Sequence, residues 1–289
     1  MAEMNTTGIV EVEGFKLGYK VEGAGLPALV IGSTVYYPRT FVGNLRQHLQ
    51  LIFIDHRGFV PPPPGDWQDE DFRLEVLLND IEAVRKALKL ERFVVIGHSG
   101  HAFLALEYAK RYPQHVSQVV MIGASPDYSE ATTQARWAFF EKDTTPERKA
   151  VFEASMAQLP QRIAADPERR FVQMCLCAGP ASWYDYRFDA TALWEGVYTN
   201  MQVFDYVWGV VFRDIDITAG LEKLDSPVLL ALGRYDYLTG LPFLWDEVQH
   251  RFSNLTLRIF EKSAHTPQLE EPDRFNRELV NWLRTGRPE

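Results

Sequence analysis

The chain has 289 residues, of which 46% are hydrophobic and 13% aromatic, enough for one large core and near the upper limit for a single domain. Its formal net charge of −9 comes from 30 lysines and arginines against 39 aspartates and glutamates. This balance disfavours a polyanionic partner, so we expect neither a nucleic acid nor a membrane surface as partner.

Short runs rich in β-branched residues alternate with longer helical patterns, which is typical of parallel strands joined by helices. We predict eight strands, at residues 9–15, 17–22, 28–31, 51–54, 93–96, 116–122, 228–232 and 255–260. The first two alternate between apolar and polar residues, as an antiparallel edge hairpin does. The other six are mostly continuous apolar runs, as expected for strands covered on both faces. Residues 74–90 carry leucines, isoleucine and valine at helical spacing, which predicts a crossover helix.

The composition changes between residues 125 and 220, where strand-like runs vanish and aromatic residues cluster in helical patterns. We interpret residues 125–220 as a helical cap inserted between the sixth and seventh strands. Residues 1–124 and 221–289 then form the α/β core.

The two cysteines, Cys175 and Cys177, are separated by one residue, a spacing that strains a disulfide and supplies half of a zinc site. We therefore expect buried free thiols, no metal and no cofactor. The first residues have no basic and apolar leader pattern, and no apolar run approaches the roughly 20 residues of a membrane helix. A cytoplasmic monomer or homodimer is expected.

The sharpest signal lies at residues 94–106, where a buried strand breaks at Gly97, presents Ser99 and turns at once into an apolar helix. So tight a turn leaves little room beside the serine, which explains the small neighbours Gly97 and Gly100. At the helix start, the free N–H of Gly100 can point at a developing oxyanion. The pattern predicts an exposed nucleophilic serine.

Residues 97–101, Gly-His-Ser-Gly-His, resemble the G-x-S-x-G nucleophile elbow of α/β-hydrolases, with His101 in place of the second glycine. The resemblance implies the α/β-hydrolase fold, a mostly parallel eight-stranded sheet flanked by helices. Residues 55–58, Asp-His-Arg-Gly, resemble the family's D-x-R-G stretch, to which we assign a structural role.

In this family the catalytic acid follows the penultimate strand and the histidine follows the last. Residues 233–236, Gly-Arg-Tyr-Asp, resemble the family's G-x-x-D turn, and residues 263–267, Ser-Ala-His-Thr-Pro, resemble its histidine loop. A serine hydroxyl needs a neutral imidazole to accept its proton and a carboxylate to hold that imidazole. We therefore expect Ser99 as nucleophile, His265 as general base and Asp236 as the orienting acid.

A second oxyanion donor comes, in this family, from the loop after the third strand. Gly32 matches the family glycine there, and Ser33 aligns with the residue whose backbone N–H is donated. The resemblance implies an oxyanion hole made by the backbone N–H groups of Ser33 and Gly100.

Histidines flank the predicted nucleophile, but residues on either side of a sharp turn diverge and no carboxylate is spaced with them, which disfavours a metal site. Candidate residues of the substrate pocket are His98, His101, Tyr36, Trp194 and Glu195.

A serine at the elbow argues against the epoxide hydrolase and haloalkane dehalogenase branches, which place an aspartate there. The motifs and long cap are similar to proline iminopeptidases, whose acidic cap residues bind a substrate amino group, a role for Glu195 or Asp205. An aromatic cap also suits hydrophobic acyl or aryl groups, so we expect a carboxylesterase of small hydrophobic or aromatic esters. Three alternatives stay open: an aminopeptidase, a non-hydrolytic receptor for a small ligand, and a cofactor-free oxygenase or carbon–carbon hydrolase.

Overall fold

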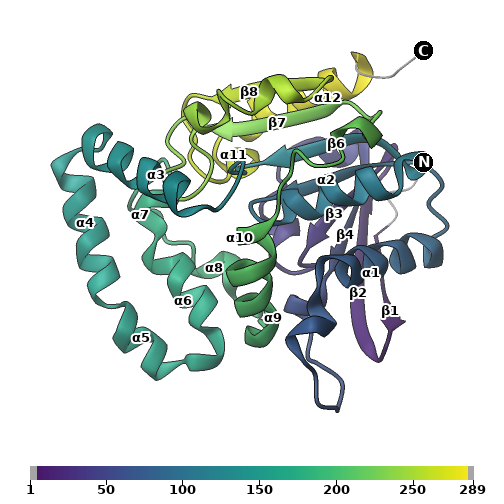
Figure 1. Ribbon diagram of the computed structural model, residues 1–289, viewed down its shortest axis with the longest axis horizontal. Coiled ribbons are helices and arrows are strands. Elements are labelled where there is room, and N and C mark those ends of the chain that lie inside the picture. Colours follow the sequence, from purple (N-terminus) through teal and green to yellow (C-terminus); the bar gives the residue numbers. More distant parts are fainter. Residues whose placement is uncertain (1–4, 286–289) are drawn as a thin grey trace.

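One twisted sheet organises the computed structural model, which describes residues 5–285 (Figure 1). Its strands are β1 (Thr6–Val12), β2 (Phe15–Gly23), β3 (Leu26–Gly32), β4 (Leu49–Asp55), β5 (Phe93–His98), β6 (Val116–Ile122), β7 (Val228–Gly233) and β8 (Leu255–Phe260). Their order in the sheet is β1-β2-β4-β3-β5-β6-β7-β8. The first two strands are antiparallel to their neighbours, and β3 to β8 are parallel. The predicted eight-stranded, mostly parallel sheet is confirmed.

The helices are α1 (Leu74–Ala87), α2 (His101–Arg111), α3 (Glu130–Asp143), α4 (Pro146–Ala157), α5 (Leu159–Ala165), α6 (Arg170–Cys177), α7 (Gly179–Ser182), α8 (Thr191–Trp194), α9 (Met201–Tyr206), α10 (Phe212–Asp214), α11 (Pro267–Glu270) and α12 (Pro272–Thr285). Because side chains alternate along a strand, the sheet builds a core on each face. Helices α1 and α2 pack on one face and α12 on the other. All residues of β5 and β7 are buried, which explains their unbroken apolar sequences.

The turn of the first hairpin lies earlier than predicted. The prediction places it between strands 9–15 and 17–22, whereas the structure pairs Val12 with Phe15 across a turn at Glu13 and Gly14. Both turn residues have positive φ, 51° and 84°, the conformation that tight hairpin turns require. Glu13 is an uncommon residue for it. The apolar positions change phase across the turn, from Val10 and Val12 to Phe15 and Leu17, and the prediction overlooks this shift.

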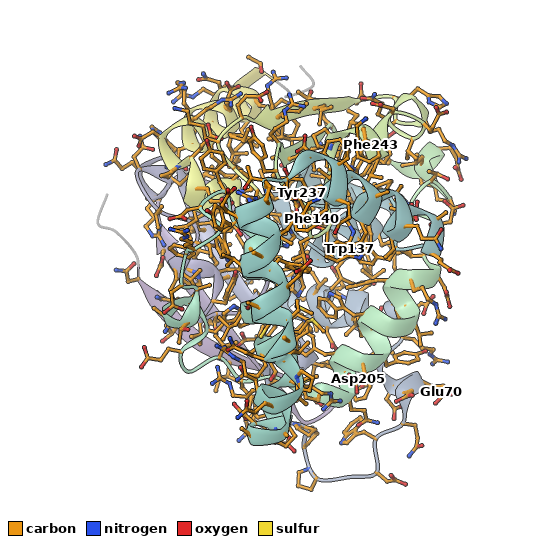
Figure 2. The ribbon with its side chains drawn as sticks, turned by 90° about the vertical axis from the view of Figure 1, so that its left-hand side faces the viewer. Glu70, Trp137, Phe140, Asp205, Tyr237 and Phe243 are labelled. Carbon is orange, nitrogen blue, oxygen red and sulfur yellow. The ribbon has the colours of Figure 1, made fainter. Side chains whose placement is uncertain are left out.

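Helices α3 to α10 occupy the segment between β6 and β7 and stand at one side of the sheet (Figure 1). A small aromatic cluster connects α3 to the loop after β7: Phe140 packs edge-on against Tyr237 with ring centroids 5.3 Å apart (Figure 2). Between α9 and α10 the helix widens into a π-helical turn, Val207–Val211. In the described part of the chain, no helix is both long and apolar enough to cross a membrane.

The loop after β4 is held by a buried arginine. The Arg57 guanidinium donates to both carboxylate oxygens of Asp80 in α1, at 2.6 and 2.9 Å, and to Glu13 in the hairpin turn at 2.7 Å. Only 1% of the Arg57 side chain is exposed, so this ion pair is shielded from water. It fixes the loop that carries His56, whose role appears below.

Candidate active site

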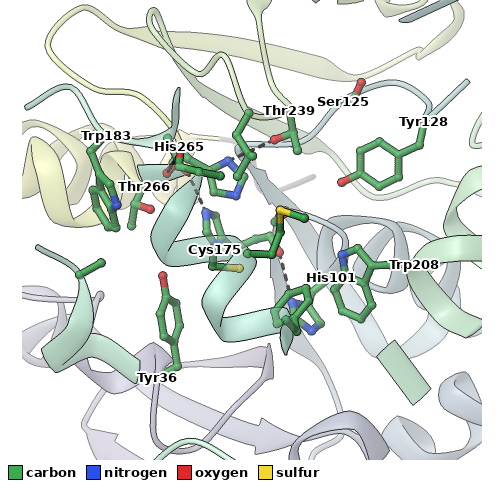
Figure 3. Close-up of a pocket in the computed structure, with 18 of the residues that line it drawn as sticks. Tyr36, His101, Ser125, Tyr128, Cys175, Trp183, Trp208, Thr239, His265 and Thr266 are labelled. Atoms are coloured by element: carbon green, nitrogen blue, oxygen red, sulfur yellow. Dashed lines mark hydrogen bonds between the residues drawn. The ribbon is translucent and has the colours of Figure 1, made fainter. Parts of the chain in front are cut away.

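A cavity of about 360 Å³ lies between the helical segment and the sheet (Figure 3). Its lining is mainly aromatic and aliphatic, with a small polar region that includes Ser99 and His265. Of the residues predicted for the pocket, His98, His101, Tyr36 and Trp194 line it. Cys175 also lines it, and both cysteines are free thiols.

Ser99 occupies the turn between β5 and α2 in a strained conformation. Its φ is 58°, in the left-handed region that costs a non-glycine residue about 1–3 kcal/mol. The turn is over-determined by its neighbours: the Ser99 N–H donates to the Ile122 carbonyl at 2.8 Å. An added Cβ on Gly97 would lie 2.1 Å from the His101 carbonyl oxygen. Close packing of α2 on β5 therefore forces the serine side chain outward, into the cavity.

His265 and Asp236 form a buried pair at the ends of β8 and β7. His265 Nδ1 donates to Asp236 Oδ2 at 2.9 Å, which leaves Nε2 as the basic nitrogen. Burial raises the pKa of Asp236, but the His265 imidazole and the N–H groups of Thr239 and Gly240 outweigh it and hold that pKa below its ordinary value. Asp236 is therefore a carboxylate throughout the neutral range.

Two glycines, Gly123 and Gly240, leave room for this pair. A Cβ on Gly123, directly after β6, would lie 3.1 Å from His265 Nδ1 and 3.4 Å from Asp236 Oδ2. A Cβ on Gly240 would lie 2.7 Å from Asp236 Oδ2. The Thr239 hydroxyl donates to the Gly123 carbonyl at 2.8 Å and lies 3.1 Å from His265 Nδ1 (Figure 3). Any side chain at Gly123 would push the histidine and the acid apart.

The main chain of His265 is held from two sides. Its N–H donates to the Ser182 carbonyl of α7 at 3.0 Å, and His98 Nε2 donates to its carbonyl at 2.8 Å. The rings of His98 and His265 lie 4.5 Å apart, centroid to centroid. His98 thus positions the histidine loop as well as lining the cavity.

His101, which stands where the elbow motif has its second glycine, points toward the loop after β4. The Gly58 N–H can only donate, so His56 Nδ1, 2.8 Å away, accepts and the proton of the neutral ring is on Nε2. His56 Nε2 then donates to His101 Nε2 at 2.9 Å, which puts the His101 proton on Nδ1, 2.8 Å from the Tyr37 hydroxyl. The chain of hydrogen bonds allows one set of tautomers.

Burial keeps His56, His98 and His101 neutral. It lowers the pKa of His56 to about 3. Burial and the neighbouring His265 lower the pKa of His98 to about 3, and burial with His56 and His98 holds that of His101 well below its ordinary value. The extra histidine is accommodated as a neutral hydrogen-bonding group, and no charge is added behind Ser99.

The two residues predicted for the oxyanion hole emerge at the same edge of the sheet. Strands β3 and β5 are parallel neighbours, paired from Ala28–Val94 to Val30–Ile96, and Ser33 and Gly100 follow the carboxyl ends of these two strands. The Ser33 side chain turns back to accept the N–H groups of Val35 and Tyr36, at 3.2 and 3.1 Å. The oxyanion role of the Ser33 and Gly100 N–H groups stays a prediction that this placement favours.

Glu195 and Asp205 lie outside the cavity, which corrects the prediction for Glu195. Glu195 is exposed and follows the short helix α8, where the chain is extended and its carbonyl accepts from Arg39 at 2.7 Å. Asp205 has a side chain that is 59% exposed and is paired with Arg170. Figure 2 places Asp205 far from Tyr237 and the loop that follows Asp236. The carboxylate that does line the cavity is Asp127.

Sequence reasoning misses several residues of the site, among them Gly123, Tyr128 and Arg136. Tyr128 and Arg136 line the cavity from the segment that follows β6. A glycine directly after a buried strand is a usable signal for Gly123, because such positions allow close approach. For the other two the sequence carries no local signal.

A family model described as "alpha/beta hydrolase fold" matches residues 24–272. The chain is 46% identical over 280 residues to "AB hydrolase superfamily protein YclE" of Bacillus subtilis (strain 168), covering 97% of this chain and 99% of that protein. It is 24% identical over 304 residues to a "Proline iminopeptidase" of Heyndrickxia coagulans, covering 97% and 99%. A solved α/β fold family hydrolase from Bacillus anthracis str. Sterne superposes with a TM-score of 0.72 at 22% identity, covering 98% and 100%.

Proposed function

The chain belongs to the α/β hydrolase fold family, and on this premise we propose that it is a serine hydrolase of small hydrophobic or aromatic carboxylic esters. One observation carries the proposal: Ser99, strained outward at φ 58°, lines the same cavity as His265, whose Nδ1 is bound to the Asp236 carboxylate. A small molecule of ester size is the partner that this cavity fits.

The proposed reaction has two stages. Ser99 Oγ attacks the ester carbonyl carbon while His265 Nε2 takes the hydroxyl proton, and the carbonyl oxygen becomes an oxyanion held by backbone N–H groups. The ester C–O bond then breaks and His265 returns the proton to the leaving alkoxide. Water attacks the acyl-enzyme with the same base, which releases the acid and restores Ser99.

An aminopeptidase is the second candidate, because a proline iminopeptidase is among the relatives. It needs a carboxylate in the cavity to bind the substrate's amino group. Glu195 and Asp205 lie outside, which leaves Asp127 as the carboxylate on the cavity wall among the described residues. Ester hydrolysis needs no such group, so ester chemistry is the better supported of the two.

Covalent labelling tests the nucleophile. We expect a fluorophosphonate probe to label the wild-type chain at one site and to fail with Ser99→Ala. Ser125→Ala is the matched control, since Ser125 is a second serine on the cavity wall and its loss leaves labelling intact. A wild-type chain that never labels, or a Ser99→Ala variant that labels at the same rate, would contradict the proposal. Turnover of acyl esters beside proline and alanine arylamides separates esterase from aminopeptidase.

The pH profile tests the base. We expect kcat/KM for an ester to fall on acidification, because a general base must be unprotonated to accept the Ser99 proton. The lowered pKa of Asp236 keeps that carboxyl ionised, and the lowered pKa values of His98, about 3, and His101 keep these rings neutral. Burial raises the pKa of Glu270, which accepts the N–H groups of Ala264 and Thr266, to about 7, so this carboxyl takes up a proton over the same range. A flat profile would contradict the assignment of His265.

A further inference from the structure

One part of the cavity wall carries a positive charge. Arg136 of α3 lines the cavity, as do Thr132 and Thr133 one turn earlier and Tyr128 just before the helix. The four residues lie on one side of α3 and its leading loop, and we call them the α3 wall. The rest of the lining combines aromatic residues such as Phe171, Trp194 and Trp208 with small polar ones such as Ser99, Ser125 and Thr239. Arg136 is the only lysine or arginine among the described residues that line the cavity.

Arg136 has no acidic partner in the described part of the chain. Its Nη1 donates to the carbonyls of Tyr237, at 3.0 Å, and Leu238. Its guanidinium carbon lies 4.6 Å from the centroid of the Trp137 ring. Burial lowers the pKa of Arg136, and only the charge of Asp236, with Tyr128, acts against it. The Nε and Nη2 of Arg136 make no hydrogen bond within the described residues, so they are available to an anion in the cavity.

Tyr128 connects this charge to the reacting centre. Its hydroxyl is buried and points toward the middle of the cavity (Figure 3). Burial raises the pKa of Tyr128, while hydrogen bonding to the Ser99 side chain and the charge of Arg136 act to lower it. The phenol is therefore a neutral donor close to both Ser99 and Arg136.

We propose that the cavity selects esters bearing a single carboxylate, which Arg136 binds with help from Tyr128. This proposal rests on the serine hydrolase function proposed above. A monoanion fits best, because the α3 wall supplies one guanidinium, while Asp127 on the cavity wall and the nearby Asp236 repel a second negative charge. The aromatic lining would take the rest of the substrate.

Matched esters test the proposal. Monomethyl glutarate and methyl pentanoate differ in one terminal group, carboxylate against methyl, and 4-acetoxybenzoate and 4-methylphenyl acetate place the same difference on the alcohol side. Hydrolysis is followed by pH-stat titration. In at least one pair we expect wild type to prefer the acid. Arg136→Gln should lower kcat/KM for that acid about 10- to 100-fold, mainly through KM, and change the neutral ester by less than about 3-fold.

Arg148→Gln is the matched control. Arg148 is a buried arginine of α4 that donates to the Tyr184 carbonyl at 2.5 Å and packs over the Tyr237 ring, yet it does not line the cavity. Its loss should affect both esters of a pair equally. Tyr128→Phe should lower the preference for the acid by less than Arg136→Gln does. Equal losses on both esters in Arg136→Gln, or a wild type without preference, would overturn the proposal and leave Arg136 as a structural link to the Asp236 loop.

A binding measurement keeps the two proposals separable. Calorimetry with the Ser99→Ala variant compares the same ligands without hydrolysis, and we expect the favoured acid to bind at least about 10-fold tighter than its neutral partner. Adding Arg136→Gln should remove the difference. If no ester is hydrolysed by wild type but the acid still binds through Arg136, the serine hydrolase proposal fails and the anion site stands. Equal binding of both ligands overturns the anion site.

Discussion

Replacing Ser99 by alanine is expected to lower kcat for a short 4-nitrophenyl ester by about 10⁴- to 10⁶-fold, and His265→Ala to do nearly the same. The double variant should be no slower than either single variant. Without His265 the Ser99 hydroxyl is not activated, and without Ser99 the histidine has no nucleophile to activate. The two side chains therefore act as a unit. Rates are measured with purified variants under saturating ester.

Two controls make this cycle informative. His250→Ala removes an exposed histidine outside the cavity and should leave kcat unchanged. Near-ultraviolet circular dichroism of each variant should match wild type, since an Ala at position 99 replaces a small side chain. Losses that multiply in the double variant would mean that Ser99 and His265 act in separate steps, which contradicts the proposed mechanism.

Replacing His56 by asparagine is expected to make the stability of the protein less sensitive to acid by about 1.4 kcal/mol per pH unit. In the unfolded chain His56 takes up a proton below its ordinary pKa of 6.5, whereas burial holds its folded pKa at about 3. Between these values the unfolded state binds one more proton. The stabilisation is therefore complete above pH 6.5 and is lost as pH falls toward 3, a total of about 5 kcal/mol.

The slope is a better readout than the stability itself. Burial raises the pKa of Asp55 to about 6 and that of Glu270 to about 7, so these carboxyls oppose the histidines at mildly acidic pH. The carboxyls contribute equally to the slopes of wild type and His56→Asn, so their contribution cancels in the difference between the two slopes. The asparagine Oδ1 can still accept the Gly58 N–H, so the loop keeps its turn.

Urea unfolding at several pH values between 7 and 5 gives the two slopes. His250→Asn, at an exposed position, is the control, and its slope should match that of wild type. Any loss of stability from the broken His56–His101 bond shifts the curve at every pH and leaves the slope unaffected. Parallel curves for wild type and His56→Asn would contradict the neutral buried state of the ring.

The strands could be predicted because buried parallel strands need uninterrupted apolar runs, which β5 and β7 have. The first turn is predicted too late in the chain, because Glu13 is a residue type that seldom takes a positive φ and the prediction overlooks the phase shift of the apolar positions. Local motifs locate Ser99, Asp236 and His265, since each lies in the turn or loop that follows a strand. Their joint catalytic role stays a prediction until the variants are measured.

The site residues that the sequence does not reveal are brought together by contacts between distant segments of the chain. Arg136 comes near Asp236 because the first helix after β6 packs on the loop after β7, which no local pattern encodes. The prediction for Glu195 fails for a related reason. Helix α8 has four residues, too few for a periodicity that would separate an inner from an outer face.

The π-helical turn at Val207–Val211 sets the position of the aromatic residues around Trp208, which lines the cavity. Trp208 stacks on Phe204 and meets Phe212 edge-on, with ring centroids 4.7 and 4.9 Å apart, and Phe212 reaches the space over Gly100. In an ordinary α-helix residues four apart drift sideways around the axis, and the wider turn compensates for that drift. Deleting one residue here would restore a regular helix and rotate everything beyond it. The position of the aromatic side chains over the serine turn therefore depends on the number of residues in this segment. An insertion or deletion would move these side chains and redirect specificity, whereas a point substitution would change only the size of one of them.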